Sequence, residues 1–260
     1  MIKRISKIVK EVGNDLLNLR KFEIKGEWEG TQFKAEADKI AHQKLVSSLK
    51  KINSSLPIIS EEDSNSLVKE RPAIYWLIDP IDGTASLAKG YFGFVTQVAL
   101  MKDNEPIISA VYAPVLNSLY TAEKGKGAFL NEKRLSIKKK MTMETLIDNY
   151  PKPQGIANEI YQSFNLKSYV ECGSISLKIC KVADGTADLF VKNVVVRDWD
   201  IAPAQLIIEE SGGCLVDLKG HAFLYSGAYE HDGLVASTSI NICKEIVLWY
   251  HALNSEEGEA

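Results

Sequence analysis

Residues 73–84 read AIYWLIDPIDGT, and this stretch decides how the chain folds. Its first six residues, Ala73–Ile78, form an unbroken apolar run of strand length, which is typical of a strand covered on both faces. Asp79 and Asp82 follow directly, so their carboxylates lie at the mouth of that strand. The proline between them and Gly83 after them favour a tight turn. The stretch therefore predicts a buried strand whose end carries two acidic side chains facing one point.

Two carboxylates on one tight turn repel each other unless a cation lies between them. A divalent cation removes that penalty, and oxygen ligands suit magnesium or manganese. Thr84 adds a hydroxyl beside the carboxylates, where it can hold a water molecule. Asp-Pro and Asp-Gly pairs are also common in solvent-exposed turns, so this stretch alone leaves a plain turn as an alternative.

Two further acidic segments occupy similar places. Glu61 and Glu62 follow a short apolar strand predicted at Pro57–Ile59, and Asp198 and Asp200 precede an amphipathic helix. Each has a plain alternative, which is a solvated charge run for the first segment and a helix N-cap for the second. A capping carboxylate can still bind a metal, and a helix N-terminus also favours anions such as phosphate.

The rest of the chain predicts mixed α and β structure, with helices covering sheets in layers. Helices are expected at 2–21 and 35–51, with a loop or irregular hairpin at Glu23–Lys34 between them. Three apolar runs predict an antiparallel meander: Phe94–Met101, Pro106–Ala113 and Ser118–Glu123. The second half is expected to hold helices at 156–164, 175–184, 201–211 and 239–253, and strands at 168–172, 187–191, 214–217 and 233–236. We divide the chain into subdomains at 1–145 and 146–260.

Composition and charge exclude several classes of protein. The 260 residues carry a net charge of −3, which argues against binding a nucleic acid polymer. No apolar stretch is long enough to span a membrane, and residues 1–20 form an amphipathic pattern that does not match a secretion signal. The four cysteines include no C-x-x-C pair and are expected to be reduced thiols. A cytoplasmic protein is therefore predicted.

Taken together, these segments resemble the inositol monophosphatase superfamily of magnesium-dependent, lithium-sensitive phosphatases. The family patterns E-E, D-P-I/L-D-G-T and W-D-x-A stand here as Glu61–Glu62, Asp79–Thr84 and Trp199–Ala202. Gly173–Leu177 and Glu210–Gly213 also resemble family segments, so the resemblance covers nearly the whole chain. It implies an α/β fold of the layered αβαβα sandwich type, a homodimer, and a small phosphorylated metabolite as substrate.

The resemblance also implies a role for each site residue. One magnesium ion is held by Glu61, Asp79 and the carbonyl of Ile81, and a second by Asp79, Asp82 and Asp200. The backbone amides of Gly83 and Thr84 contact the phosphate, and Thr84 orients the attacking water with help from Glu61 or Asp38. The substrate-binding set is completed by Gly173, Ser174, Ser176, Lys192 and Asp200.

One segment departs from the family pattern. The family usually has Thr three residues before the acid that Asp38 matches, and this chain has Ala35. The loop Lys25–Lys34 also lacks the usual polar signature. In the family this loop acts as a mobile lid and can help to bind a third metal ion, so a third ion and lid closure stay open for this chain.

A second departure from the family pattern indicates which substrate to expect. Inositol monophosphatases have a Glu that binds inositol hydroxyls seven residues before the Asp of the W-D pattern, where this chain has Asn193 beside Lys192. A lysine there resembles the 3′(2′),5′-bisphosphate nucleotidases (the CysQ type), where it can pair with the second phosphate of adenosine 3′,5′-bisphosphate. We therefore expect a phosphomonoesterase that converts this nucleotide to AMP and phosphate.

Other substrates and one other function stay open. The spacing of Gly173–Leu177 matches the inositol phosphatases better, so inositol 1-phosphate or another sugar or polyol phosphate is the first alternative. Other monoesters, such as histidinol phosphate, are the next. The alternative of a different class is a catalytically weak regulatory protein on the same fold. The complete set of acidic ligands argues against it, because clustered buried carboxylates are costly without a cation.

Overall fold

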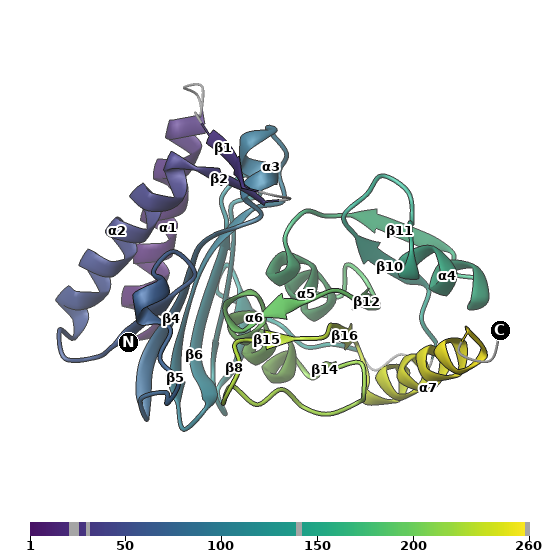
Figure 1. Cartoon of the computed structure of the whole chain (residues 1–260). Helices are drawn as coiled ribbons and strands as arrows, with labels where there is room; N and C mark the ends of the chain where they lie inside the picture. The colour runs from purple at the N-terminus through teal and green to yellow at the C-terminus, as the bar shows by residue number, and fades with distance from the viewer. Residues whose placement is uncertain (21–25, 30–31, 139–141, 258–260) are drawn as a thin grey trace.

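The computed structural model describes residues 1–20, 26–29, 32–138 and 142–257. Its helices and strands stack in alternating layers, with the N-terminus and the C-terminus on opposite sides of the molecule (Figure 1). The helices are α1 (Ile2–Arg20), α2 (Glu36–Ile52), α3 (Thr84–Ala88), α4 (Ile156–Ser163), α5 (Ile175–Ala183), α6 (Asp198–Ser211) and α7 (Ile240–Glu257), with a 3-10 turn η1 at Ser64–Ser66.

The first large sheet is built from the N-terminal half in chain order. It contains β3 (Ile58–Ser60), β4 (Ile74–Asp82), β5 (Val95–Lys102), β6 (Glu105–Ala113), β7 (Ser118–Glu123), β8 (Gly127–Leu130) and β9 (Lys133–Arg134). Strands β3 and β4 are parallel, with Ser60 opposite Ile78, and each later pair is antiparallel. The predicted meander of β5, β6 and β7 is therefore confirmed.

The second large sheet belongs to the C-terminal half and has the order β11-β10-β12-β16-β14. Its strands are β10 (Thr145–Asp148), β11 (Ser168–Glu171), β12 (Leu189–Lys192), β14 (Cys214–Val216) and β16 (Leu234–Ser237). Strand β10 runs parallel to both β11 and β12. Two short antiparallel pairs lie outside the large sheets: β1 (Gly26–Glu29) with β2 (Gln32–Ala35), and β13 (Val196–Arg197) with β15 (Glu230–His231).

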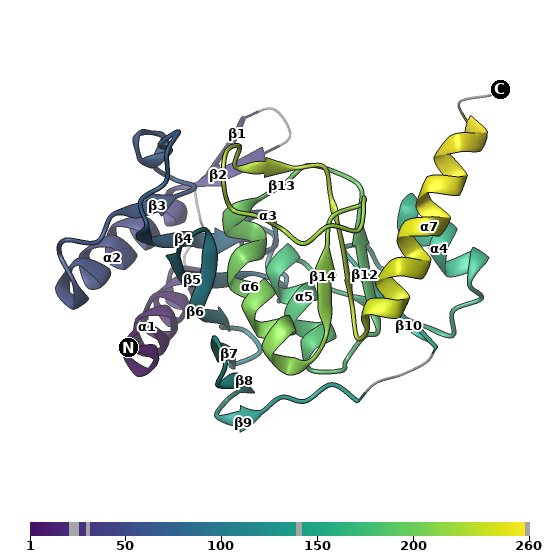
Figure 2. The ribbon, with the colours of Figure 1, turned by 90° about the horizontal axis from the view of Figure 1, so that it is seen from below.

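Three apolar clusters join the layers. Helices α1 and α2 pack Ile5 and Leu45 against Trp76 on one face of the first sheet. Helices α5 and α6 fill the space between the two large sheets (Figure 2), where Ile207 belongs to the same cluster as Leu77. Helices α4 and α7 cover the outer face of the second sheet. The layers thus follow the order αβαβα, which confirms the predicted sandwich.

Some elements differ from the sequence-based prediction. Helix α6 begins at Asp198 and not at residue 201, because the carboxylate of Asp200 already accepts a hydrogen bond from the backbone N–H of Arg197. Residues 145–148, where we expected only a boundary, form β10. The large sheet of the first half ends before residue 135 and that of the second half begins at residue 145, and the division into subdomains stays a prediction.

The structure also bears on the predictions about membrane spans, the cysteines and the loop Lys25–Lys34. In the described part of the chain, no helix is long and apolar enough to cross a membrane. Cys172, Cys180, Cys214 and Cys243 are all free thiols, and Cys214 is the most exposed of them. The loop Lys25–Lys34 lies partly outside the described residues, and the backbone that is described there forms the hairpin of β1 and β2.

Candidate active site

Three carboxylates from the two halves of the chain meet where β4 ends and α6 begins. One oxygen of each of Asp79, Asp82 and Asp200 lies within 4.8 Å of the others. Asp79 is fully buried, and Asp82 is 8% exposed. Acidic groups this close and this buried form a candidate site for a divalent cation, with oxygen ligands of the kind that magnesium prefers.

The end of β4 is shaped so that both of its carboxylates face this point. The register with β5 shifts between Asp79 and Asp82, and such an irregularity re-aims side chains. The backbone N–H of Ile81 donates to Asp79 Oδ1 at 3.0 Å, and Thr96 Oγ1 donates to the Pro80 carbonyl at 2.9 Å. Gly83 then turns the chain with φ of 92°, a left-handed conformation that favours glycine.

The first turn of α6 holds Asp200, and a proline further along the helix leaves one carbonyl of this turn without its helical donor. Pro203 lacks the N–H that would bond to the carbonyl of Trp199 four residues earlier. Gln97 Nε2 donates to that carbonyl at 2.8 Å and also to Asp79 Oδ2 at 3.2 Å. Gln97, buried in β5, therefore connects a carboxylate on β4 to the helix that carries Asp200.

The electrostatic environment of the three carboxylates favours the binding of a cation. Burial is the largest cause that raises the pKa of Asp79 far above its usual value, followed by the charges of Glu61, Asp82 and Asp200. Burial, then Asp82 and Glu61, likewise raises the pKa of Asp200. Buried like charges destabilise each other, and a divalent ion between them reverses the sign of the interaction. The donor set therefore fits a magnesium site.

Glu61 lies beside this group, at the end of β3. Because β3 and β4 are parallel neighbours, their carboxyl ends lie at one edge of the sheet. Burial first, and then the charges of Glu62, Asp82 and Asp38, raise the pKa of Glu61 to about 7. The structure thus places this predicted ligand within the electrostatic reach of the other carboxylates.

Thr84 and Asp38 come together although 46 residues separate them in the sequence. The Thr84 hydroxyl Oγ1 lies 3.2 Å from Asp38 Oδ1 and 3.1 Å from the Ile81 carbonyl, and both of these oxygens are acceptors. Asp38 is buried in the first turn of α2. A hydroxyl that donates to either acceptor keeps its own lone pairs for a water molecule.

The N-terminus of α5 contacts the acidic group directly. Ser174 caps the helix by accepting from the N–H of Leu177 at 2.9 Å. The N–H of Ser176 donates to Asp82 Oδ2 at 2.9 Å, and the Ser176 hydroxyl donates to the carbonyl of Asp200. A Cβ on Gly93 would lie 2.3 Å from the nitrogen of Gly173, so this turn packs closely on the loop after α3. The hydroxyl groups of Ser174 and Ser176 therefore already form hydrogen bonds within the protein.

Lys192 belongs to a second charged group, at the ends of β10 and β12. Its Nζ lies 3.1 Å from Asp148 Oδ1, and Lys178 Nζ lies 3.5 Å from the same oxygen. Lys178 also donates to the side chain of Asn149. Burial lowers the pKa of Lys178 to about 8, and Asp148 opposes this effect. Two lysines therefore share one aspartate, which leaves an excess of positive charge.

Sequence reasoning did not find Gln97 or Asp148. Asp148 follows an apolar strand, Leu146 and Ile147, so the signal that singled out Asp79 was also present there. Gln97 gave no comparable signal, because a single glutamine in an apolar strand has no spacing partner. Its role becomes visible only when α6 is placed against β5.

Comparisons with known proteins agree with this geometry. The profile of the inositol monophosphatase family matches residues 1–248. The chain is 33% identical to a 3′(2′),5′-bisphosphate nucleotidase CysQ of Haemophilus influenzae, with 74% of each chain covered. It is 32% identical to the Nus factor SuhB of Pasteurella multocida, with 73% of this chain and 74% of that one covered.

A solved structure is similar over almost the full length. It is described as an IMPase/NADP phosphatase complexed with Mg²⁺ and phosphate, has 25% sequence identity and a TM-score of 0.80, and covers 95% of this chain and 92% of its own. The family match, the fold and the acidic group at the ends of β3, β4 and the start of α6 agree. The chain belongs to the inositol monophosphatase family and is a phosphatase.

Proposed function

We propose that this chain is a magnesium-dependent phosphomonoesterase that acts on adenosine 3′,5′-bisphosphate and releases AMP and phosphate. The observation that carries the hydrolytic part is the group of Asp79, Asp82 and Asp200, whose oxygens lie within 4.8 Å of one another. In the proposal, Glu61, Asp79 and the Ile81 carbonyl hold one ion. Asp79, Asp82 and Asp200 hold another. Bound there, magnesium lowers the pKa of a water and neutralises charge on the phosphoryl group.

The protein orients the attacking water through Thr84. Asp38, one of the two acids predicted to help, lies within hydrogen-bonding distance of the Thr84 hydroxyl, at 3.2 Å. A threonine held in this way accepts a hydrogen bond from the water and fixes its direction of attack. The backbone amides of Gly83 and Thr84, at the turn after β4, are proposed to contact the phosphate.

The nucleotide part of the proposal rests on the second sheet. After β10 the chain passes to β11 on one side, and after β11 it passes to β12 on the other side of β10. Ligands of parallel sheets bind outside the carboxyl ends of the strands at such a reversal. Asp148 and Lys192 are the last residues of β10 and β12, so the group of two lysines lies at this position.

The charge of this group favours a second anionic substituent. A pair of one lysine and one aspartate is neutral, whereas Lys178 and Lys192 with Asp148 keep one positive charge. Lys178 also attracts Asp82, which indicates that this charge is felt at the acidic group. A substrate with one phosphate on the metals can thus place its second phosphate near Lys192.

Inositol 1-phosphate is the second candidate substrate. It is favoured by the bond between Lys192 and Asp148, which already satisfies part of the lysine charge. A weak regulatory protein is the candidate of another class, in keeping with the relative described as a Nus factor. The absence of magnesium-dependent phosphate release on all phosphomonoesters tested would favour this last reading.

The test compares phosphate release from adenosine 3′,5′-bisphosphate, adenosine 3′-monophosphate and inositol 1-phosphate at equal concentration. In the Lys192→Gln variant, kcat/KM for the bisphosphate should fall by about 10–100-fold, which is the worth of a charge-assisted hydrogen bond. The 3′-monophosphate lacks the second phosphate, so its rate should not change. Lys167→Gln, which removes an exposed lysine paired with Glu144, serves as the control. Equal losses on both nucleotides, or a preference for inositol 1-phosphate, would overturn the nucleotide assignment.

We also propose three properties that the family resemblance implies for this protein. Lithium is expected to inhibit in competition with magnesium, the protein is expected to form a homodimer, and it is expected to act in the cytoplasm. Inhibition at rising magnesium concentration and the mass of the particle in solution test the first two. Fractionation of cells that produce the protein tests the third.

A further inference from the structure

A buried ion pair outside the proposed ligand set joins the two halves of the molecule. Arg71 Nη1 contacts Asp198 Oδ2, and the two side chains are 2% and 0% exposed. The other carboxylate oxygen of Asp198 lies 2.7 Å from His231 Nε2. A buried pair gains little stability over apolar side chains of the same size. We therefore consider a role other than stability for the pair of Arg71 and Asp198.

The pair connects the two segments that carry proposed metal ligands from opposite halves. Asp198 is the first residue of α6, two residues before Asp200. Arg71 lies ten residues after Glu61, in the segment 61–73 that links β3 to β4 and that we call the Glu61 loop. The ion pair between Arg71 and Asp198 is a point at which these two segments contact each other.

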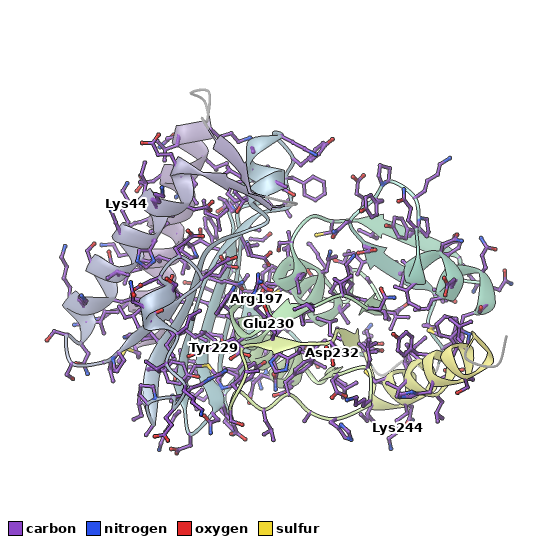
Figure 3. All side chains as sticks on the ribbon, in the orientation of Figure 1. Lys44, Arg197, Tyr229, Glu230, Asp232 and Lys244 are labelled. Carbon is purple, nitrogen blue, oxygen red and sulfur yellow. The ribbon has the colours of Figure 1, made fainter. Side chains whose placement is uncertain are left out.

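Further contacts fix the Glu61 loop at the same place. Arg71 Nη2 donates to the carbonyl of Ala228 at 3.1 Å, and its guanidinium carbon lies 4.0 Å from the centre of the Tyr229 ring. The Tyr229 hydroxyl donates to the carbonyl of Val68 at 3.0 Å, and the N–H of Asp198 donates to the carbonyl of Tyr229 at 3.0 Å. Figure 3 labels Tyr229 at this junction, near Arg197 and Glu230.

We propose that Arg71 and Asp198 are positioning residues of the metal site, which hold the Glu61 loop and the first turn of α6 at the separation that the metal ions require. Magnesium tolerates little deviation from octahedral geometry at about 2.0–2.1 Å. A displacement of either segment moves Glu61 or Asp200 away from the other ligands. The inference rests on the metal site of the proposed function, and it is independent of which phosphomonoester is the substrate.

Positioning and simple electrostatics predict opposite changes in magnesium affinity when Arg71 is replaced by Gln. Arg71→Gln removes a positive charge near a cation site, so electrostatics alone would strengthen magnesium binding. Positioning predicts the opposite, a dissociation constant for Mg²⁺ that is higher by about 10–100-fold, as is typical when partners that orient metal ligands are lost. Binding is measured by titration calorimetry with Mg²⁺ alone, and kcat and KM are measured at saturating magnesium.

Two more variants keep the test decisive if Arg71→Gln does not fold. The double variant Arg71→Gln with Asp198→Asn removes both charges, so electrostatics predicts unchanged binding and positioning predicts weaker binding. Arg71→Lys keeps the charge but cannot reach all the acceptors of the guanidinium, and it should restore binding only in part. Arg134→Gln makes the same chemical change at an exposed arginine on β9, and this matched control should bind magnesium as the parent does.

The outcomes distinguish this inference from the proposed function. Weaker Mg²⁺ binding in folded Arg71→Gln or in the folded double variant, with the KM for substrate at saturating magnesium unchanged, supports positioning. Binding that is unchanged or tighter in folded variants, Arg71→Lys included, overturns it and leaves the pair as a structural contact. A parent protein that binds no Mg²⁺ would instead overturn the metal site of the proposed function.

Discussion

Replacement of Asp82 by Asn should change the stability of the metal-free protein and its activity in opposite directions. The variant should be more stable than the parent protein without metal, and it should be nearly inactive with metal. Asparagine keeps the shape of the side chain and the oxygen that accepts from the N–H of Ser176. It removes one of three negative charges whose oxygens lie within 4.8 Å of one another.

The magnitude follows from Coulomb's law. Two unit charges 4.8 Å apart repel by about 3.5 kcal/mol at an effective dielectric constant of about 20. Because burial and mutual repulsion raise the pKa values of Asp79 and Asp200, part of this repulsion is already relieved by bound protons. The variant also loses the attraction of Lys178 for Asp82. We therefore expect a net gain of about 1–2 kcal/mol, which raises the Tm by about 2–8 °C.

Thermal unfolding in EDTA and in magnesium provides the assay. The parent protein should gain stability as magnesium is added, by about 2.7 kcal/mol at a concentration 100 times the dissociation constant. Asp82→Asn should gain little, and its phosphatase rate should fall by at least about 100-fold. Asp15→Asn, at an exposed aspartate paired with Lys44, makes the same chemical change and should alter neither property. If metal-free Asp82→Asn melts below the parent and still responds to magnesium, repulsion among these carboxylates does not limit the stability of the metal-free protein.

Three further predictions concern the same region. Because the folded protein raises the pKa of Glu61 from 4.5 to about 7, metal-free stability should fall as the pH rises through that window, and magnesium binding should tighten over it. Calorimetry at several pH values checks this, and pH-independent affinity would contradict it. Gln97→Leu leaves the carbonyl of Trp199 without its donor and should cost about 1–3 kcal/mol, whereas adding Pro203→Ala supplies an N–H and should recover part of the loss. Denaturant titration of the single and double variants checks this, and additive effects would count against it. Gly93→Ala should lower both stability and activity, because its Cβ would lie 2.3 Å from the nitrogen of Gly173, while Gly185→Ala, with open space around it, should cost only backbone strain. Equal melting temperatures for these two variants would argue against the close packing.

Much of the fold was predictable because its signals are local. The strand β4 and the three strands of the meander are apolar runs, and α1 has an amphipathic period, so the positions of these elements follow from short windows of sequence. The start of α6 was misplaced by three residues because Asp200 lies inside the first turn, where its carboxylate accepts from the N–H of Arg197. Helix α3, with five residues, is too short for its period to be recognised.

The candidate site was predictable only in part, for a physical reason. Acids that directly follow apolar strands, such as Asp79 and Glu61, stand out from the sequence by themselves. Contacts between distant segments do not, because they depend on how layers pack. Gln97 reaches Asp79 and Trp199 across two layers, and Arg71 reaches Asp198 over 127 residues of sequence. The lysine pair at Asp148 likewise depends on the reversal of strand order around β10.

The central claim is that the carboxylates at the end of β4 and the start of α6 hold the catalytic metal. Anomalous diffraction from crystals grown with Mn²⁺ and phosphate tests it most directly, because manganese suits the same oxygen ligands and can be located by its own signal. We expect manganese peaks in coordination contact with Asp79, Asp82 and Asp200. Active crystals whose manganese peaks lie away from these three carboxylates would contradict it.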